Sequence, residues 1–237
     1  MAKISPKKTE PATAANNTQK PAARDRIIDA LMSLAAASSW DQITLPMIAA
    51  EAHVSLADLR DHYPSKGAIL GGLSKRIDRI VLDGTGDDMI GEPARERVLD
   101  IMMRRMDALQ PYKAALKEVR NATRRDPLML AALNQLALNS WRYMLAAADI
   151  DTEDGLGMVR VQGAAVVFAR TLDTWFDDEG ADLAQTMAKL DIELGKGEKV
   201  MDRLENMRRM AAPFRGFLRA AMERRGENKS RRDERRS

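Results

Sequence analysis

Apolar residues recur every three or four positions along most of this chain, which is the spacing of one face of an α-helix. No segment shows the strict alternation of a half-buried β-strand. Prolines 93, 111 and 127 each stand where an apolar stripe begins, and the first turn of a helix tolerates the missing N–H. The pattern predicts an all-α protein, with helices over residues 24–38, 65–82, 93–109, 111–125, 127–148, 156–176, 181–210 and 213–225.

Residues 44–66, TLPMIAAEAHVSLADLRDHYPSK, combine two short helices with a tight turn. Thr44 is expected to cap the first helix, and Pro46 falls in its first turn. Ser55, followed three residues later by Asp58, forms a capping box that starts the second helix, and Pro64 ends it. This arrangement predicts a helix-turn-helix, whose second helix can enter the major groove of DNA.

Together with the preceding amphipathic helix, this stretch resembles the TetR-type transcriptional regulators. Their pattern is a "T-x-x-x-I-A-x-x-A-G-V-S" run and an "L-Y-x-H-F-x-S-K" finish, and this chain has TLPMIAAEAHVS and LRDHYPSK. It departs from the pattern at His53, where Gly is usual, at Arg60, where Tyr is usual, and at Gly67, where an acidic residue is common. We expect His53 to adopt the left-handed backbone conformation that Gly would supply.

The resemblance implies an N-terminal three-helix helix-turn-helix domain that a linking helix joins to a larger helical domain for ligand binding and dimerisation. We place the boundary at the polar break of residues 83–88. The expected organisation is a disordered basic arm (1–23), a DNA-binding domain with its linking helix (24–82), a ligand-binding and dimerisation domain (93–212), and an amphipathic helix with a charged tail (213–237).

The second short helix carries most of the expected contacts with double-stranded DNA. By resemblance, Lys66 contacts a phosphate, and Arg60 replaces the usual Tyr as a phosphate or guanine contact. Tyr63 is also compatible with a role as a core anchor, and His62 with packing. The candidate DNA-binding residues are Thr44, Ser55, Leu56, Ala57, Arg60, His62, Tyr63 and Lys66.

The last two long helices are the expected dimer interface. The run GAAVVFA at residues 163–169 is apolar all round, so it must be covered on more than one side. In TetR-type proteins such helices form a four-helix interface between two copies, although both helices could instead be buried within one chain. The candidate interface residues are Val166, Val167, Arg170, Leu183, Met187, Leu190 and Leu194.

The body is rich in methionine, of which the chain has 15. Methionine fills irregular cores, and it also lines adaptable apolar pockets. The second alternative predicts a hydrophobic or amphipathic small-molecule ligand. The candidate pocket residues are Met102, Met106, Tyr112, Leu116, Trp141 and Met144.

The composition of the chain argues against several kinds of functional site. The chain has no cysteine and two histidines, both inside the helix-turn-helix, so we expect no metal site and no cofactor. No nucleophile–base set, phosphate loop or dinucleotide fingerprint is present, and we do not expect an enzyme. The N-terminus lacks the apolar core of a signal peptide, and no apolar run is long enough to span a membrane, so the expected location is the cytoplasm.

The net charge of +3 is distributed unevenly. Residues 1–23 carry +3 and residues 224–237 carry +4, whereas residues 24–66 carry −2. Phosphate neutralisation supplies most non-specific DNA affinity, so an acidic module starts at a disadvantage.

Two functions follow from these patterns. The first is a homodimeric TetR-type repressor that binds a palindromic operator and is released by a hydrophobic small molecule. The second is a lipid-binding accessory protein of the same fold, similar to those of ubiquinone biosynthesis, that has lost DNA binding. Its amphipathic C-terminal helix would make peripheral contact with a membrane surface.

Overall fold

The computed structural model describes the backbone of residues 22–86 and 89–234, and the side chains of that range as far as residue 210. Within these residues all regular structure is helical, which confirms the all-α prediction. The expected disordered arm lies almost entirely outside the described residues. Among the helices that are described, none is both long and apolar enough to cross a lipid bilayer.

The N-terminal part is a small bundle whose apolar stripes face one another. Ile27, Leu31 and Ile48 are fully buried in it. Trp40 lies in a short 3-10 helix that packs against α6 (Lys113–Thr123), and its side chain is buried. The elements are α1 (Ala23–Ala37), η1 (Trp40–Gln42), α2 (Leu45–Glu51), α3 (Leu56–His62) and the linking helix α4 (Lys66–Gly84).

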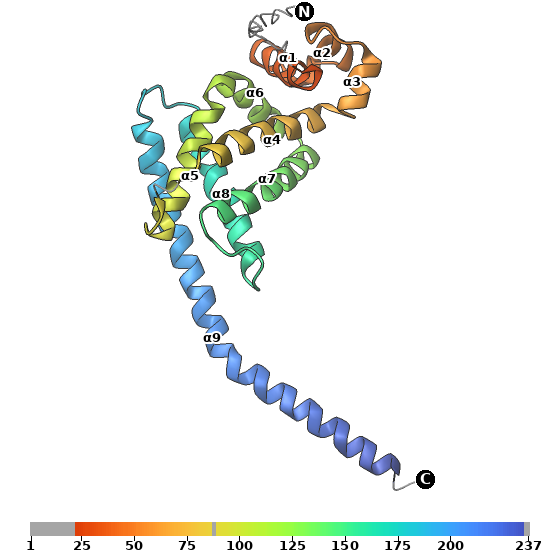
Figure 1. Cartoon of the computed structure of the whole chain (residues 1–237), viewed down its shortest axis with the longest axis vertical. Coiled ribbons are helices and arrows are strands. Elements are labelled where there is room, and N and C mark those ends of the chain that lie inside the picture. Colours follow the sequence, from red (N-terminus) through yellow and green to blue (C-terminus); the bar gives the residue numbers. More distant parts are fainter. Residues whose placement is uncertain (1–21, 87–88, 235–237) are drawn as a thin grey trace, which may run out of the picture.

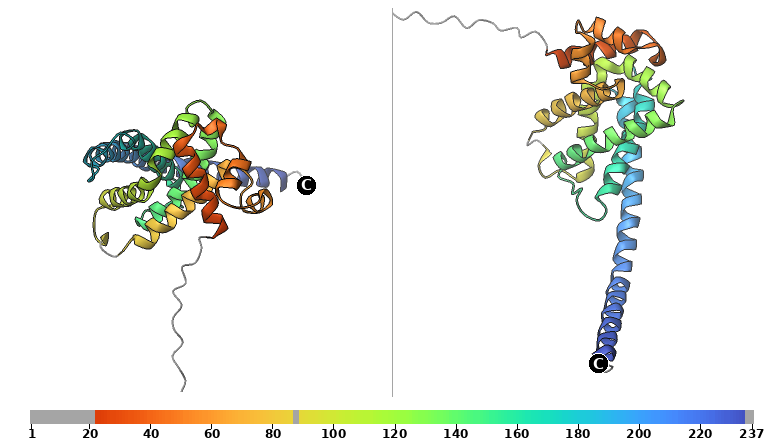
Figure 2. Two further views of the ribbon diagram at one scale, coloured as in Figure 1. Left: turned by 90° about the horizontal axis from the view of Figure 1, so that it is seen from above. Right: turned by 90° about the vertical axis from the view of Figure 1, so that its right-hand side faces the viewer.

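The larger body begins after the loop that follows α4. Its elements are α5 (Ala94–Leu109), η3 (Gln110–Tyr112), α6 (Lys113–Thr123), α7 (Pro127–Ala147), α8 (Gly157–Trp175) and α9 (Ala184–Glu234). Helix α4 packs against α1, α5 and α7, and α6 packs under α1. The short helices α2 and α3 lie at one end of the molecule, and α9 leaves the body at the other end (Figures 1 and 2).

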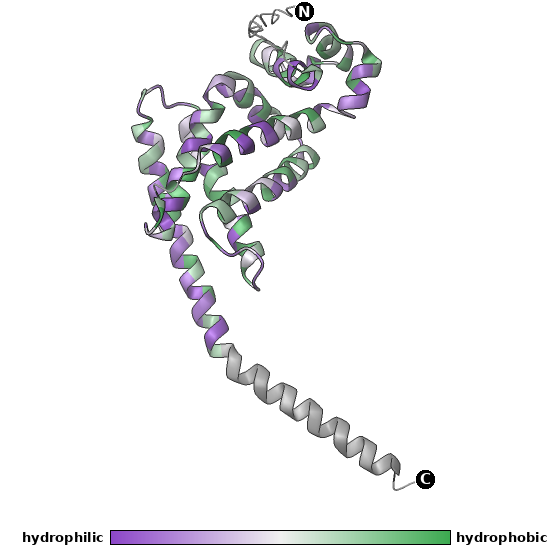
Figure 3. Ribbon diagram, viewed as in Figure 1, coloured by the Kyte–Doolittle hydropathy of each residue, from purple (hydrophilic) through white to green (hydrophobic). Residues whose placement is uncertain are grey.

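Helix α9 differs from the prediction. We expected one helix to end near residue 210 and a second to occupy residues 213–225, but α9 continues as one element to Glu234. A proline inside a helix removes one backbone hydrogen bond, and the Ala, Met, Arg and Leu residues around Pro213 favour the helix on both sides. The polar composition of α9 where it leaves the body is visible in Figure 3. The expected amphipathic face of residues 213–225 lies outside the described side chains.

Two arginines fix α4 to its neighbours. Arg76 pairs with Asp25 at 2.8 Å and with Asp29 at 2.5 Å, both on α1. Arg105 on α5 pairs with Asp78 on α4, and the hydroxyl of Ser140 on α7 donates to the same carboxylate at 2.5 Å. The linking helix is therefore held by charge-assisted hydrogen bonds to α1 on one side and to the body helices α5 and α7 on the other.

Candidate DNA interface and apolar hollow

The helix-turn-helix is built by local caps. The Thr44 hydroxyl oxygen accepts from the Met47 N–H at 3.4 Å. At the start of α3, the Ser55 hydroxyl accepts from the Asp58 N–H at 3.0 Å, and the Asp58 carboxylate accepts from the Ser55 N–H at 3.2 Å. The Ser55 hydroxyl also donates to the Asp58 carboxylate at 2.7 Å, and this bond, followed by the one from the Ser55 N–H, lowers the pKa of Asp58. His53 has φ 52°, as predicted for the turn.

One face of α3 is free of the body. Ser55, Leu56, Ala57 and Arg60 are exposed, and Leu56 exposes 52% of its surface. Thr44 at the start of α2 is exposed as well, and so is His62 at the end of α3. The structure thus brings six of the eight DNA-binding candidates to the surface of this motif, and a major groove admits an exposed α-helix of this kind.

Unlike the other six candidates, Tyr63 is buried and Lys66 is half-buried. Tyr63 is 2% exposed and packs in the core, where burial raises its pKa. The Lys66 ammonium donates to the carbonyl oxygens of Trp40 at 2.7 Å and Ile43 at 2.9 Å, and it lies 4.5 Å from the centre of the Trp40 ring. Burial lowers the pKa of Lys66. The two carbonyl hydrogen bonds occupy two of the three donors of the Lys66 ammonium and hold it toward η1, so a phosphate contact in this position is limited to the third donor.

The acidity of residues 24–66 is partly compensated by cations outside that segment. Asp25 and Asp29 pair with Arg76, and Asp41 lies 4.0 Å from Arg125. A charge count over residues 24–66 alone does not include these partners. In the described structure, three carboxylates of residues 24–66 have no ion-pair partner outside that segment: Glu51, Asp58 and Asp61. Of these, Asp58 is used in capping.

The predicted methionine-rich pocket is mostly filled core. Met106, Trp141 and Met144 are at most 2% exposed, and the Trp141 ring meets Phe168 edge-on at 5.1 Å. Tyr112 and Leu116 are half-buried against the core. Met102 is the one pocket candidate that also lines a hollow.

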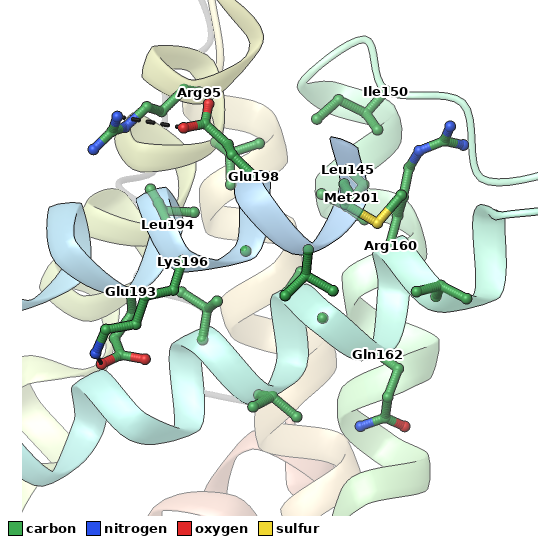
Figure 4. A pocket seen from close by; sticks show the side chains of 18 of the residues that line it. Arg95, Leu145, Ile150, Arg160, Gln162, Glu193, Leu194, Lys196, Glu198 and Met201 are labelled. Carbon is green, nitrogen blue, oxygen red and sulfur yellow. Dashed lines mark hydrogen bonds and ion pairs between the residues drawn. The ribbon is translucent and has the colours of Figure 1, made fainter. Parts of the chain in front are cut away.

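That hollow has a volume of about 1040 Å³ and lies between α5, the end of α7, α8 and α9 (Figure 4). Its size suits a small-molecule site. Two helical glycines leave space in its wall: a Cβ at Gly163 would meet nothing within 4 Å, and one at Gly197 would meet Val167 at 3.9 Å. The apolar side chains larger than alanine that line it are Val98, Met102, Leu145, Ile150, Met158, Val159, Val166, Val167, Leu194, Val200 and Met201.

The residues expected at the dimer interface divide into two groups. Val167, Leu183, Leu190 and Leu194 are 0–9% exposed, so the structure uses them within one chain. Val166, Arg170 and Met187 are exposed and remain available to a second copy. Helices α8 and α9 pack against each other within one chain, which accounts for the buried group.

A charged cluster that the sequence reasoning missed lies on the rim of the hollow. Glu193 is 3% exposed and accepts from Lys196 at 2.7 Å, Lys189 at 3.0 Å and Arg170 at 3.3 Å. The bonds from Lys196 and Lys189 lower the pKa of Glu193 to about 2. The available signal was the i+3 and i−4 spacing of the two lysines around Glu193. Among the described residues, no three His, Asp or Glu side chains form a group that could hold a metal ion.

Comparison with known proteins places this architecture. No protein-family model matches the chain. It is 27% identical over 137 residues to the HTH-type transcriptional repressor KstR of Rhodococcus jostii, a match that covers 57% of this chain and 56% of that relative. The chain therefore spans little more than half the length of the curated relative that it matches.

Solved structures match over more of the chain. A TetR transcriptional regulator from Nitrosomonas europaea matches with a TM-score of 0.59 at 22% identity, over 74% of this chain and 97% of that one. One from Rhodococcus sp. RHA1 matches with a TM-score of 0.55 at 15% identity, over 74% and 95%. At these identities the matches show the fold, and they confirm the TetR-type resemblance at that level.

Proposed function

We propose that this chain, which has the fold of the TetR-type regulators, is a homodimeric DNA-binding transcriptional repressor that an apolar or amphipathic small molecule releases from its operator. The observation that carries the proposal is the exposed face of α3, held by a complete capping box at the tip of the molecule. Residues 24–82 would bind DNA, and residues 93–212 would bind the ligand and the second copy. The role is binding rather than catalysis.

Within the DNA-binding part, Arg60 is the cation that we expect to contact phosphate or guanine. It is exposed on α3, whereas the Lys66 ammonium is engaged by backbone carbonyls. Leu56 and Ala57 are apolar and exposed, and such side chains contact thymine methyl groups in a major groove. We therefore assign base-edge contacts to Ser55, Leu56 and Ala57, and a charge contact to Arg60.

Two copies are needed for a palindromic operator, because each α3 reads one half-site. Half-sites about 34 Å apart, one turn of DNA, require the two N-terminal parts to be held at a fixed spacing. The exposed residue Met187 on α9 belongs to the surface that we assign to the contact between copies.

Helix α4 is the proposed link between ligand and DNA. Met102 on α5 lines the hollow, and Arg105 lies one turn further along the same helix and holds Asp78 of α4. A ligand that displaces α5 would shift this ion pair and with it the position of α3. Release then requires that the ligand bind the DNA-incompetent spacing more tightly than the competent one.

The experiment is genomic footprinting of the full chain, followed by titration of the recovered duplex with purified protein. We expect an enriched palindrome, two chains per duplex, and weaker binding by Arg60→Ala. No enriched palindrome, or a single chain per duplex, would contradict the proposal.

One observation favours the lipid-binding alternative. With Lys66 turned toward η1, the two short helices α2 and α3 present Arg60 as their exposed cation against Glu51, Asp58 and Asp61. Flotation of the full chain with anionic liposomes tests this alternative in parallel. Flotation that is lost in Phe217→Asp, in the absence of any operator, would favour the lipid-binding role.

A further inference from the structure

We propose that the hollow between α5, α8 and α9 binds a single-chain amphiphile with an anionic head, of the long-chain carboxylic acid class. The carboxylate would be held at Arg170 and Lys196, and the hydrocarbon chain would lie along the apolar wall toward Leu145 and Ile150. The inference deepens the proposed function and rests on it only for the consequence that such a ligand releases DNA.

The apolar wall defines the chain of the ligand. Eleven of the residues that line the hollow are valine, leucine, isoleucine or methionine, and they come from four helices and from the loop after α7. Figure 4 shows Glu193 and Lys196 on one side of the hollow and Leu145 and Ile150 on the other. A ligand that touches both sides must therefore be extended, with one polar end and one apolar end.

The charge of the rim defines the head. Glu193 is surrounded by three cations, so this cluster carries two positive charges more than its carboxylate neutralises. Arg95 is outnumbered by its two acids, Asp191 and Glu198. Arg160 shares its acids, Asp154 and Glu205, with Arg208 and Arg209, so that cluster has an excess of one positive charge, smaller than the excess around Glu193. An anionic head is therefore favoured on the Glu193 side of the rim.

The exposure of the rim side chains fits a ligand whose anionic head lies at the mouth of the hollow. The side chains of Arg170 and Lys196 are 63% and 58% exposed, whereas Glu193 is 3% exposed. The two cations can turn part of their hydrogen-bonding capacity toward a head group at the mouth, because an ammonium has three donors and a guanidinium five. The head would stay hydrated and the chain would be buried.

Gly197 explains why this space stays open. Glycine inside a helix is less favourable than alanine by about 1 kcal/mol, and Gly197 lies in α9 beside Val167 in the lining of the hollow. A Cβ at this position would lie 3.9 Å from Val167, an ordinary contact distance, and we expect the rest of a leucine side chain to extend into the hollow. Gly197→Leu is thus a variant that fills the hollow while favouring the helix.

The test is binding of dansyl-labelled undecanoic acid to the full-length chain, followed by fluorescence, with the methyl ester of the same probe as the uncharged ligand. We expect the acid to bind at least about tenfold more tightly than the ester, which corresponds to one charge-assisted contact. Arg170→Gln with Lys196→Gln should remove this preference. Gly197→Leu should abolish binding of both probes, and Gly84→Leu, at an open site away from the hollow, should leave it unchanged.

Glu193→Gln best distinguishes a carboxylate that competes with the ligand from one that is merely structural, because it removes the carboxylate that competes for the cations. The variant should bind the acid several-fold more tightly and the ester unchanged, whereas a merely structural Glu193 would give weaker binding of both. Lys199→Gln, an equal loss of charge on an exposed residue outside the hollow, is the matched control for the charge changes.

Three results would overturn the proposal: equal affinity for acid and ester, unchanged acid binding by the double variant, or acid binding only after dilution has dissociated the dimer. The last would mean that the second copy fills the hollow. Failure of the proposed function looks different, since the acid would bind as expected while no duplex is bound. Failure of the ligand inference would leave a duplex bound with an affinity that the acid does not change.

Discussion

The ion pair between Arg105 and Asp78 offers a quantitative test of how α4 is held on the body. The side chains of Arg105 and Asp78 are 8% and 15% exposed. The Asp78 carboxylate accepts from Arg105 and from the Ser140 hydroxyl, and Arg105 also donates to Ser74 at 3.3 Å. The guanidinium carbon lies 5.8 Å from the ring centres of Trp141 and Phe168.

Asp78→Ala leaves a buried guanidinium with the Ser74 hydroxyl and two aromatic faces as its partners. Removing one member of a buried pair costs about 3–5 kcal/mol, in line with two charge-assisted hydrogen bonds at about 1.5–3 kcal/mol each. With an m-value near 3 kcal/mol/M, the urea midpoint should fall by about 1–2 M. Circular dichroism at a fixed protein concentration measures it, because unfolding of a dimer depends on concentration.

Two further variants make the test specific. Asp83→Ala, an exposed acid on the same helix, should change the free energy of unfolding by at most about 0.5 kcal/mol. Asp78→Leu combined with Arg105→Met should recover most of the stability, because an apolar pair of similar volume replaces a buried ion pair well. A loss of less than about 1 kcal/mol in Asp78→Ala, indistinguishable from Asp83→Ala, would refute the reasoning.

Three other predictions follow from single sites. The pKa of Glu193 is lowered from 4.5 to about 2 in the folded chain. Its contribution to the free energy of unfolding is therefore complete above about pH 4.5 and declines as the pH falls toward 2. When unfolding is measured as a function of pH, Glu193→Gln should lose less stability over that window than the unchanged chain. A Cβ at Gly72 would lie 2.4 Å from the Tyr63 hydroxyl oxygen, so Gly72→Ala should destabilise by about 1–3 kcal/mol in urea, and adding Tyr63→Phe should restore part of the loss. Lys66→Ala should lower the free energy of unfolding by about 1–3 kcal/mol, because the carbonyl hydrogen bonds are lost. Arg60→Ala should leave stability unchanged and reduce the slope of log binding constant against log salt concentration by about one. The opposite pattern would assign the phosphate contact to Lys66.

The helix-turn-helix could be predicted from the sequence because its determinants are local. The caps at Thr44, Ser55 and Ser65 each bond to the N–H group three residues further along the chain, and the left-handed turn at His53 lies between the first two. Such spacings are visible in a linear sequence. The face of α3 that is free for DNA follows from the same periodicity.

The contacts that the sequence did not reveal are long-range. Lys66 reaches carbonyls 23 and 26 residues away, and its inward orientation depends on how η1 packs over α4. Periodicity identifies the apolar face of each body helix but not which neighbour covers it, so Met106 and Met144 were expected in a pocket and instead fill the core. The hollow exists where α9 and α8 diverge beside two glycines, and no spacing along one helix shows that.

The most direct measurement of the central claim is a fluorescence anisotropy titration of the footprinted duplex with the full-length chain, with and without undecanoic acid. We expect saturation at two chains per duplex, a salt-dependent affinity that a scrambled duplex does not match, and release of the duplex by the acid but not by its methyl ester. Binding that is equal for footprinted and scrambled duplexes, or no binding at all, would contradict the assignment of this chain as an operator-binding regulator.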